Sequence, residues 1–386
     1  MKEFNKEGWT CTKSIKEPCM FIIRRGEEYA YMIIHTDDGD VVGTSNKFND
    51  EILAKLNKLW ECKRTDSTSM LGLQRRITEK DGVKSVEITM TPFIEGMLEA
   101  FKTETQYETR GNNVKTRYTP VPEDLMLTRS PKDSTKHELE GKRVIDRGFQ
   151  RLLGMLLWAA RGVFPECLVG TSFLGRCMAC PTEEAWNAGI HMLEYMYQNR
   201  TRGIIFSTDN VRSMFPIAHT DASNKPDPSD SKCQYGYCIH WMGPIVFASR
   251  KLNHIGLSAA HNEYMALHWC IRHVMWLRAL LVEMGLAEMV ETPTIVRGDN
   301  TAANTLCEED IVTTGNQFIT TPYHYNKEAV AEGHVKIEYI KTDRNVADLF
   351  TKAIKKGVIQ QLLDALLGYV DVFEGAAKRT GIDKDT

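Results

Sequence analysis

Hydrophobic and polar positions in residues 1–92 follow the pattern of a small α+β layer. Four runs of β-forming residues predict strands, at 20–25, 28–34, 70–73 and 86–90. The Gly26-Glu27 pair separates the first two runs, so these are expected to form a hairpin. In residues 49–62 apolar side chains recur every three to four positions, which predicts a helix with Asn49 as its N-cap.

Helical spacing dominates after Pro92. Residues 93–101 predict a short amphipathic helix, and the polar, charged stretch 102–142 predicts a long loop. Three further helices are then expected, at 146–161, 166–180 and 183–199. Thr182 is the predicted N-cap of the last one. This part of the chain is therefore predicted to be a small helical region.

Strand patterns return after Gly203, at 204–206, 217–220, 235–241, 245–249, 294–297 and 335–340. A long helix is predicted for 258–284, with Gly285 as its C-terminal stop. Shorter helices are expected near 301–308 and 323–331 and from residue 346 onward. Meandering strands that continue into parallel strands through crossover helices predict one mixed five-stranded sheet flanked by helices. The fold class is therefore multidomain, with an α+β part followed by an α/β part.

Composition agrees with a globular protein of more than one domain. The chain has 386 residues, of which 42% are hydrophobic and 26% charged. The net charge of −3 provides no overall basic signal, so cations for a nucleic-acid partner would be local, as in Arg24-Arg25, Lys63-Arg64, Arg75-Arg76 and Arg250-Lys251. The N-terminus has no signal-peptide core, and the longest apolar run, 152–160, is shorter than a membrane span. We expect an intracellular protein, cytoplasmic or nuclear, with no membrane partner.

Cysteine usage indicates reduced thiols, because ten cysteines are scattered without regular spacing. Only Cys177 and Cys180 have the spacing of metal ligands. No second pair follows at zinc-finger distance, and the surrounding segment is apolar. Buried core thiols are therefore favoured over zinc or redox chemistry.

Four acidic residues stand at the ends of predicted elements in the second half of the chain. Asp221 follows strand 217–220, Asp299 follows strand 294–297, and Glu263 and Asp348 lie early in helices. Each alone has an ordinary explanation, as a turn residue or a solvated helix charge. Sites in open sheets gather at strand ends near the topological switch point, so the joint placement predicts one carboxylate cluster.

Such a cluster indicates a metal site, because four carboxylates repel one another unless cations neutralise them. Ligands that are all oxygen favour Mg²⁺ or Mn²⁺ over zinc. Two such ions roughly 4 Å apart promote attack of water on a phosphodiester. The expected activity is therefore metal-dependent cleavage of nucleic acid with two ions.

Short segments in the same half occur in a recognisable order: Thr220–Ser223, Gly236–Tyr237, Gly243–Ile245, Ala248–Lys251, Glu263–Leu267, Trp276–Arg278, Asp299–Asn300, Tyr323–Tyr325 and Ala347–Lys352. Through them, residues 204–352 resemble the ribonuclease H domain of copia-type retrotransposon Pol polyproteins. The resemblance implies that Asp221, Glu263, Asp299 and Asp348 form the catalytic, metal-binding tetrad. It also implies an endonuclease that hydrolyses the RNA strand of RNA–DNA hybrids.

The resemblance extends toward the N-terminus. Phe149–Leu157 and Pro181–Trp186 are similar to the family's thumb, and Leu71–Leu73 to its Leu-Gly-Ile segment. His35–Asp38 occupies the place of the reverse transcriptase Tyr-x-Asp-Asp turn, so Asp37 and Asp38 are implied to be a polymerase-motif remnant. The implied domains are a partial palm at 1–92, a thumb-like helical region at 93–203, a ribonuclease H-like domain at 204–357 and a C-terminal tail at 358–386.

The chain departs from the family in three ways. His35 replaces the aromatic residue of the polymerase turn, and only 34 residues precede it, too few for the third carboxylate and the nucleotide-binding fingers. We therefore expect a truncated polymerase part that is inactive alone. His261 stands where the family has Glu, which removes the expected capping partner of the helix that carries Glu263.

Two alternatives remain to the ribonuclease interpretation. In the first, an upstream polyprotein segment completes an RNA-directed DNA polymerase. In the second, the protein binds nucleic acid without catalysis.

Overall fold

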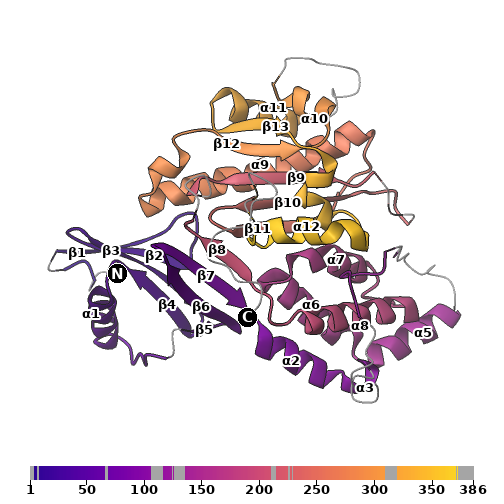
Figure 1. Ribbon diagram of the computed structural model, residues 1–386, viewed down its shortest axis with the longest axis horizontal. Coiled ribbons are helices and arrows are strands. Elements are labelled where there is room, and N and C mark those ends of the chain that lie inside the picture. The colour runs from indigo at the N-terminus through magenta and orange to yellow at the C-terminus, as the bar shows by residue number, and fades with distance from the viewer. Residues whose placement is uncertain are drawn as a thin grey trace. The chain divides into compact units, whose positions relative to one another are not determined.

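The computed structural model describes residues 4–6, 8–65, 68–105, 116–123, 125, 135–209, 214–224, 227, 229–308, 320–370 and 372. The chain divides into two compact units, whose elements Figure 1 labels. The first comprises Met1–Arg75 with Met275–Glu291, and the second comprises Arg76–Val274 with Thr292–Thr386. The four domains implied by the family resemblance stay a prediction.

The first unit contains a four-stranded antiparallel sheet in chain order. Its strands are β1 (Trp9–Lys13), β2 (Met20–Arg25), β3 (Glu28–His35) and β4 (Asp38–Gly43). The predicted hairpin is confirmed, since Arg25 pairs with Glu28 and Gly26 takes a φ of 59° at the turn. Phe48 and Ile52 of helix α1 (Asn46–Asn57) pack into the same buried core as Trp9.

Helix α1 begins earlier and ends earlier than predicted, so the bounds 49–62 were wrong. Ser45 is the N-cap, and its Oγ accepts a hydrogen bond from the Phe48 N–H at 3.1 Å. Asn49 lies inside the helix. Beyond Asn57 the side chain of Trp60 is 61% exposed, so continued helix would have gained little burial there.

The predicted strand 70–73 is a turn. Strand β5 (Ser69–Met70) ends there and β6 (Leu73–Lys80) begins, with Met70 paired to Leu73. Leu71 and Gly72 between them have φ values of 54° and 81°. This left-handed backbone reverses the chain, which a run of β-forming residues does not indicate.

The helical part of the second unit comprises α2 (Thr91–Ala100), α3 (Lys102–Thr105), α5 (Thr135–Asp146), α6 (Phe149–Gly162), the 3₁₀ helix η2 (Pro165–Cys167), α7 (Leu168–Arg176) and α8 (Glu183–Gln198). Helix α8 begins as predicted, because Thr182 Oγ1 accepts a hydrogen bond from the Ala185 N–H at 3.2 Å. Helix α5 corrects the prediction of a loop up to residue 142. Much of that loop, including 106–115 and 126–134, lies outside the described residues.

The predicted mixed five-stranded sheet is confirmed in the second unit. Its strands are β9 (Ile217–Ala222), β10 (Gln234–His240), β11 (Pro244–Lys251), β12 (Thr294–Gly298) and β13 (Val335–Tyr339). The spatial order is β11-β10-β9-β12-β13. The first three strands are antiparallel neighbours, whereas β12 runs parallel to both β9 and β13. This order places the change from meander to crossover between β9 and β12.

Helices cover both faces of this sheet (Figure 1). On one face Tyr235 and Tyr237 of β10 contact Trp269 and His273 of α9 (Ala259–Met284). Crossover helices α10 (Thr301–Glu308) and α11 (Thr320–Ala331) connect β12 to β13. On the opposite face the 3₁₀ helix η6 (Val346–Phe350) packs on β9 and β10, and α12 (Lys356–Leu366) packs on η6.

One prediction for this half needs correction. The element at 346–350 is a 3₁₀ helix rather than the start of a long helix, because its packing on the sheet holds it to five residues before the chain extends. The predicted strand at 204–206 is β8 (Ile204–Ser207), which pairs antiparallel with β7 (Val83–Thr89) in a separate sheet. The predicted tail helix is confirmed as α12, whereas the charged end at 373–386 lies outside the described residues.

The helices that the structure describes include none with the length and apolar character needed to cross a lipid bilayer.

The prediction that Cys177 and Cys180 are buried core thiols is correct for one of the two residues. Cys177 is buried, whereas Cys180 is half-buried. No group of three or more potential metal ligands among the described residues includes either one.

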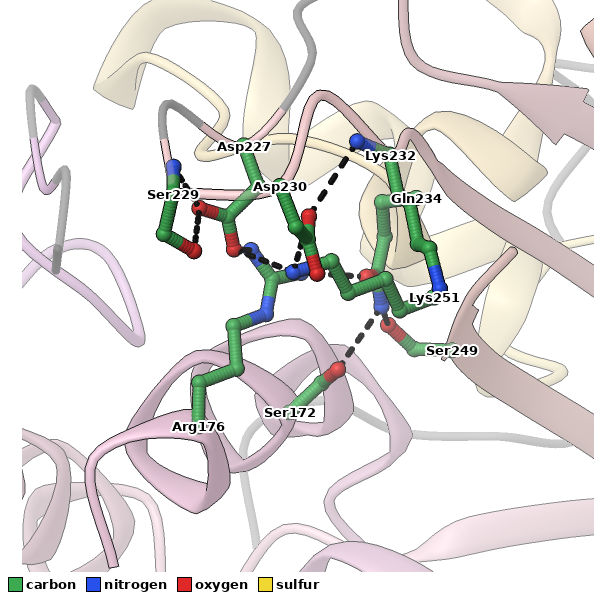
Figure 2. A network of polar contacts seen from close by, with 9 residues as sticks. All are labelled: Ser172, Arg176, Asp227, Ser229, Asp230, Lys232, Gln234, Ser249 and Lys251. Atoms are coloured by element: carbon green, nitrogen blue, oxygen red, sulfur yellow. Dashed lines mark hydrogen bonds and ion pairs between the residues drawn. The ribbon is translucent and has the colours of Figure 1, made fainter. Parts of the chain in front are cut away.

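A buried ionic network holds the β9–β10 loop against helix α7 (Figure 2). Asp227 is only 5% exposed, and its Oδ2 lies 3.0 Å from Arg176 Nη1 and 2.6 Å from Lys251 Nζ. Its Oδ1 accepts hydrogen bonds from the N–H and hydroxyl of Ser229. Burial alone would raise the pKa of Asp227, but Lys251, Ser229 and Arg176 outweigh it and hold this pKa well below its usual range.

We expect Asp227→Asn to destabilise the second unit by about 3 kcal/mol at pH 7, because Arg176 then loses a buried anionic partner. A carboxyl with a lowered pKa stabilises the fold above its ordinary pKa and loses this effect as the pH falls toward the folded value. The difference in free energy of unfolding between the variant and the wild type should therefore narrow below pH 4. Urea unfolding at pH 7 and pH 3.5 measures it. The exposed control Asp343→Asn should stay within about 0.5 kcal/mol of wild type.

Candidate metal centre

Three of the four predicted acids converge at one end of the mixed sheet. Asp221 lies in β9, Asp299 directly follows β12, and Asp348 lies in η6. One carboxylate oxygen from each lies within 4.8 Å of those of the other two. Because β9 and β12 are parallel neighbours, their carboxyl ends meet at the same edge, as the sequence predicted.

The junction after β12 holds Asp299 in place. Asn300 caps α10 by accepting a hydrogen bond from the Ala303 N–H at 3.0 Å. Asn304, one turn into that helix, donates from Nδ2 to the Gly298 carbonyl oxygen at 3.0 Å. Thr342 Oγ1 donates to Asp299 Oδ2 at 2.7 Å. The half-buried Asp299 carboxylate is therefore oriented by a side chain from the connection after β13.

Glu263 reaches the same strand end from helix α9. Its side chain is 5% exposed, and Oε2 accepts a hydrogen bond from the Ala222 N–H at 3.0 Å. Burial, together with the charges of Asp221 and Asp299, raises the pKa of Glu263 to about 9. The structure therefore brings the fourth predicted acid beside the three aspartates, although it is not one of the group within 4.8 Å.

The electrostatics of this cluster favour a bound cation. Burial raises the pKa of Asp221, and burial together with the charge of Asp221 raises the pKa of Asp348 to about 7. Asp348 Oδ1 is buried and has no hydrogen-bond partner among the described residues. Buried carboxylates that are otherwise forced toward protonation, together with an unsatisfied oxygen, fit a hard divalent ion such as Mg²⁺ or Mn²⁺.

Two residues next to Asp348 support the cluster, and sequence reasoning gave neither of them a role. Thr351 Oγ1 donates a hydrogen bond to Asp221 Oδ2, and Lys352 Nζ lies 2.8 Å from Asp348 Oδ2. Burial alone would lower the pKa of Lys352, but the charges of Asp221 and Asp348 raise it. Both residues belong to the segment 347–352, so the family motif itself was the signal that pointed to them.

Asn345 and Gly236 determine how closely η6 approaches the sheet. Asn345 is fully buried, donates from Nδ2 to the Thr220 carbonyl oxygen at 3.0 Å and accepts from the Ala347 N–H at 3.2 Å. Gly236 is the register partner of Asp221 on β10. A Cβ at Gly236 would lie 2.3 Å from the Cβ of Phe350, so this contact requires glycine.

His261 itself takes part in the cap of helix α9. Its N–H donates to Ser258 Oγ at 3.1 Å, and its ring Nδ1 accepts from the Leu257 N–H at 3.2 Å. The replacement of the family's Glu at this position therefore does not leave the start of the helix without a capping side chain.

Asp37 and Asp38 are exposed at the β3–β4 turn, where Thr36 has a φ of 52°. The potential metal clusters found in the described residues include neither aspartate. The nearby Asp40 is paired with Arg75. Within the described residues, the structure therefore places neither Asp37 nor Asp38 in such a cluster, and their assignment as a polymerase-motif remnant stays a prediction.

No family model matches the chain. It is similar to the retrovirus-related Pol polyprotein from transposon RE2 of Arabidopsis thaliana, with 23% identity over 351 residues, covering 90% of this chain and 22% of the relative. The Pol polyprotein from transposon TNT 1-94 of Nicotiana tabacum is also 23% identical over 351 residues, covering 90% of this chain and 25% of the relative. The predicted resemblance to copia-type Pol polyproteins is confirmed as a distant match, and the chain spans about a quarter or less of these relatives.

Among solved structures, the chain matches that of LC11-RNase H1, isolated from compost by a metagenomic approach. The sequence identity is 17% and the TM-score 0.28, and the match covers 39% of this chain and 99% of that one.

We expect Glu263→Gln to stabilise the metal-free protein at pH 8. A carboxyl with a raised pKa favours folding below its ordinary pKa of about 4.5, and this contribution is lost as the pH rises through about 9. Gln stays neutral and can still accept the hydrogen bond from the Ala222 N–H. The free energy of unfolding at pH 8 should therefore increase by about 1–3 kcal/mol.

Thermal unfolding in chelator at pH 5 and pH 8 measures this effect, and the gain should be larger at pH 8. Mg²⁺ should then stabilise the wild type more than the variant. The exposed control Glu308→Gln should behave as wild type in both series. A variant that is less stable than wild type in chelator at pH 8 would contradict the assigned electrostatics.

We expect Gly236→Ala to push η6, and with it Asp348, away from β9. The steric overlap with Phe350 should cost about 1–3 kcal/mol of stability and reduce the Mg²⁺-induced rise in Tm. Gly357→Ala is the matched control, because a Cβ there meets nothing within 4 Å. An unchanged Mg²⁺ response in Gly236→Ala would show that the contact does not position the cluster.

Proposed function

We propose that the C-terminal part of this chain, residues 204–357, is a metal-dependent ribonuclease of the H type that hydrolyses RNA in RNA–DNA hybrids. The observation that carries the proposal is the convergence of Asp221, Asp299 and Asp348 within 4.8 Å at the edge of the mixed sheet. The distant similarity to Pol polyproteins along 90% of the chain supports the assignment to nucleic-acid chemistry. Glu263 completes the proposed tetrad.

In this proposal the four carboxylates hold two Mg²⁺ or Mn²⁺ ions. When bound, such ions activate the attacking water and stabilise the leaving 3′ oxygen of a phosphodiester. The residues of this chain position the ligands: Thr351 holds Asp221, Thr342 holds Asp299, and the Ala222 N–H holds Glu263. Such fixed ligands reduce the reorganisation needed when substrate arrives.

The partner would be an RNA–DNA hybrid, recognised without a broad basic surface. Several cations of the predicted basic pairs are already in ion pairs: Arg25 with Glu28 and Glu51, Arg64 with Asp50, Arg75 with Asp40, and Lys251 with Asp227 and Asp230. Lys352, beside Asp348, brings a positive charge to the cluster itself. Recognition is therefore proposed to centre on the metal site rather than on those pairs.

We further propose that residues 1–92 are a partial polymerase palm, 93–203 a thumb-like region and 358–386 a tail. Asp37 and Asp38 lie at an exposed turn without a third potential ligand in the described residues. The ribonuclease reaction is therefore the activity proposed for this chain, and polymerase activity is assigned only to an assembly with an upstream segment.

We expect the purified chain to cleave the labelled RNA strand of an RNA–DNA hybrid in the presence of Mg²⁺, and not the same RNA alone. Asp221→Asn should reduce the rate at least 100-fold, because one metal ligand loses its charge while its shape is kept. Asp343→Asn, at an exposed position outside the cluster, should retain the wild-type rate.

A quenched hybrid substrate followed with Mg²⁺, with Mn²⁺ and with chelator measures this reaction. Binding of the hybrid without cleavage by folded wild type would favour the non-catalytic binder instead. Cleavage that persists in Asp221→Asn would overturn the residue assignment.

A further inference from the structure

We propose a second metal site, for a thiophilic ion such as Zn²⁺, formed by His219, Cys238 and His240 inside the ribonuclease H-like part. Their potential ligand atoms lie within 4.8 Å of one another. All three side chains are at least 95% buried. The site is distinct from the carboxylate cluster in its donors, which are nitrogen and sulfur rather than oxygen.

Strand register brings these residues together. Cys238 of β10 is the register partner of His219 of β9, and His240 follows two residues along β10. Residues two apart on a strand share a face, so all three project from the same side of the sheet. This side faces η6 and α12. Gly236, two residues before Cys238 and so on the same face, packs against Phe350 of η6, and His240 Nε2 hydrogen-bonds to the Leu366 carbonyl oxygen of α12.

The buried ring of His219, whose nitrogens are unsatisfied among the described residues, points to a bound ligand. Its side chain is fully buried, and neither ring nitrogen has a hydrogen-bond partner among the described residues. An unsatisfied buried polar group is unfavourable for folding, and native proteins satisfy most such groups. Coordination of a cation by one imidazole nitrogen would use a lone pair that otherwise has no partner.

The ring of His240 is oriented as a metal ligand would be. Its Nε2 lies 3.1 Å from the Leu366 carbonyl oxygen, which can only accept, so Nε2 carries the hydrogen and Nδ1 presents a lone pair. Nδ1 lies 3.8 Å from Cys238 Sγ. A tetrahedral zinc ion, with Zn–S of about 2.3 Å and Zn–N of about 2.0 Å, separates such ligands by about 3.5 Å. A hydrogen bond from the far nitrogen to a carbonyl is the usual outer contact of a metal-bound histidine.

The charge around the site permits a cation. Arg297, the register partner of His219 on β12, has its Nε 3.7 Å from Glu338 Oε2, so its charge is partly balanced by that carboxylate. Binding would release the Cys238 thiol proton to solvent and form a metal–thiolate bond, with two neutral imidazoles as the other protein ligands. The net charge added at the site is then +1 rather than +2.

Co²⁺ titration of the full chain tests the proposal. We expect a thiolate-to-cobalt charge-transfer band that saturates at one ion per chain and disappears when Zn²⁺ is added. Cys238→Ser should abolish the band, because the hydroxyl keeps the polar contact to His240 without a thiolate. The buried Cys307→Ser is the matched control and should keep the band. Asp221→Asn should also keep it, since carboxylate-bound cobalt has no thiolate transition.

A second variant keeps the test informative if Cys238→Ser does not fold. His240→Gln can still donate to the Leu366 carbonyl but loses the ring lone pair, so it should bind Co²⁺ at least tenfold more weakly. Zn²⁺ should raise the Tm of wild type and not that of either variant. Absence of a thiolate band in folded wild type, or a band of equal intensity in Cys238→Ser, would overturn the proposal.

Discussion

The parallel pairing of β9 with β12 is the constraint on which the site depends. It brings the carboxyl ends of two strands, which are far apart in sequence, to one edge, where Asp221 and Asp299 meet. The connection between these two strands runs through the antiparallel strands β10 and β11 and then through helix α9. Helix α9 in turn delivers Glu263 to the backbone of β9. One topological choice therefore places three acids before any side-chain contact is considered.

Bringing these acids together is unfavourable in the absence of a cation, and the surrounding contacts reduce that cost only in part. The Thr351 and Thr342 hydroxyls and the Ala222 N–H stabilise the charged carboxylates. Lys352 adds one positive charge, yet the pKa values of Glu263 and Asp348 stay raised by burial and repulsion. Because one Lys cannot neutralise three buried acids and the half-buried Asp299, the cluster is better suited to bound ions than to a closed set of ion pairs.

The fold was predictable where local patterns determine the structure. The five strands of the mixed sheet, the cap at Thr182 and the positions of the acids all follow from periodicity and element ends. The 3₁₀ form of η6 and the pairing of β8 with β7 were not predictable, because packing between distant segments decides them. The role of Gly236 also depends on register with Asp221, which no single sequence pattern specifies.

Side chains alternate between the two faces of strand β9, which explains how two kinds of metal site can lie on one strand. His219 and Asp221 share a face and are roughly 7 Å apart along it, from the rise of about 3.3 Å per residue. At the open end of the sheet Asp221 meets carboxylates, which favour hard ions, whereas His219 meets Cys238 and His240 in the interior. Mg²⁺ binds thiolate and imidazole poorly, so it would not compete for the inner group. The inner ion would instead fix β9 against β10 and η6, and so support the strand that carries Asp221.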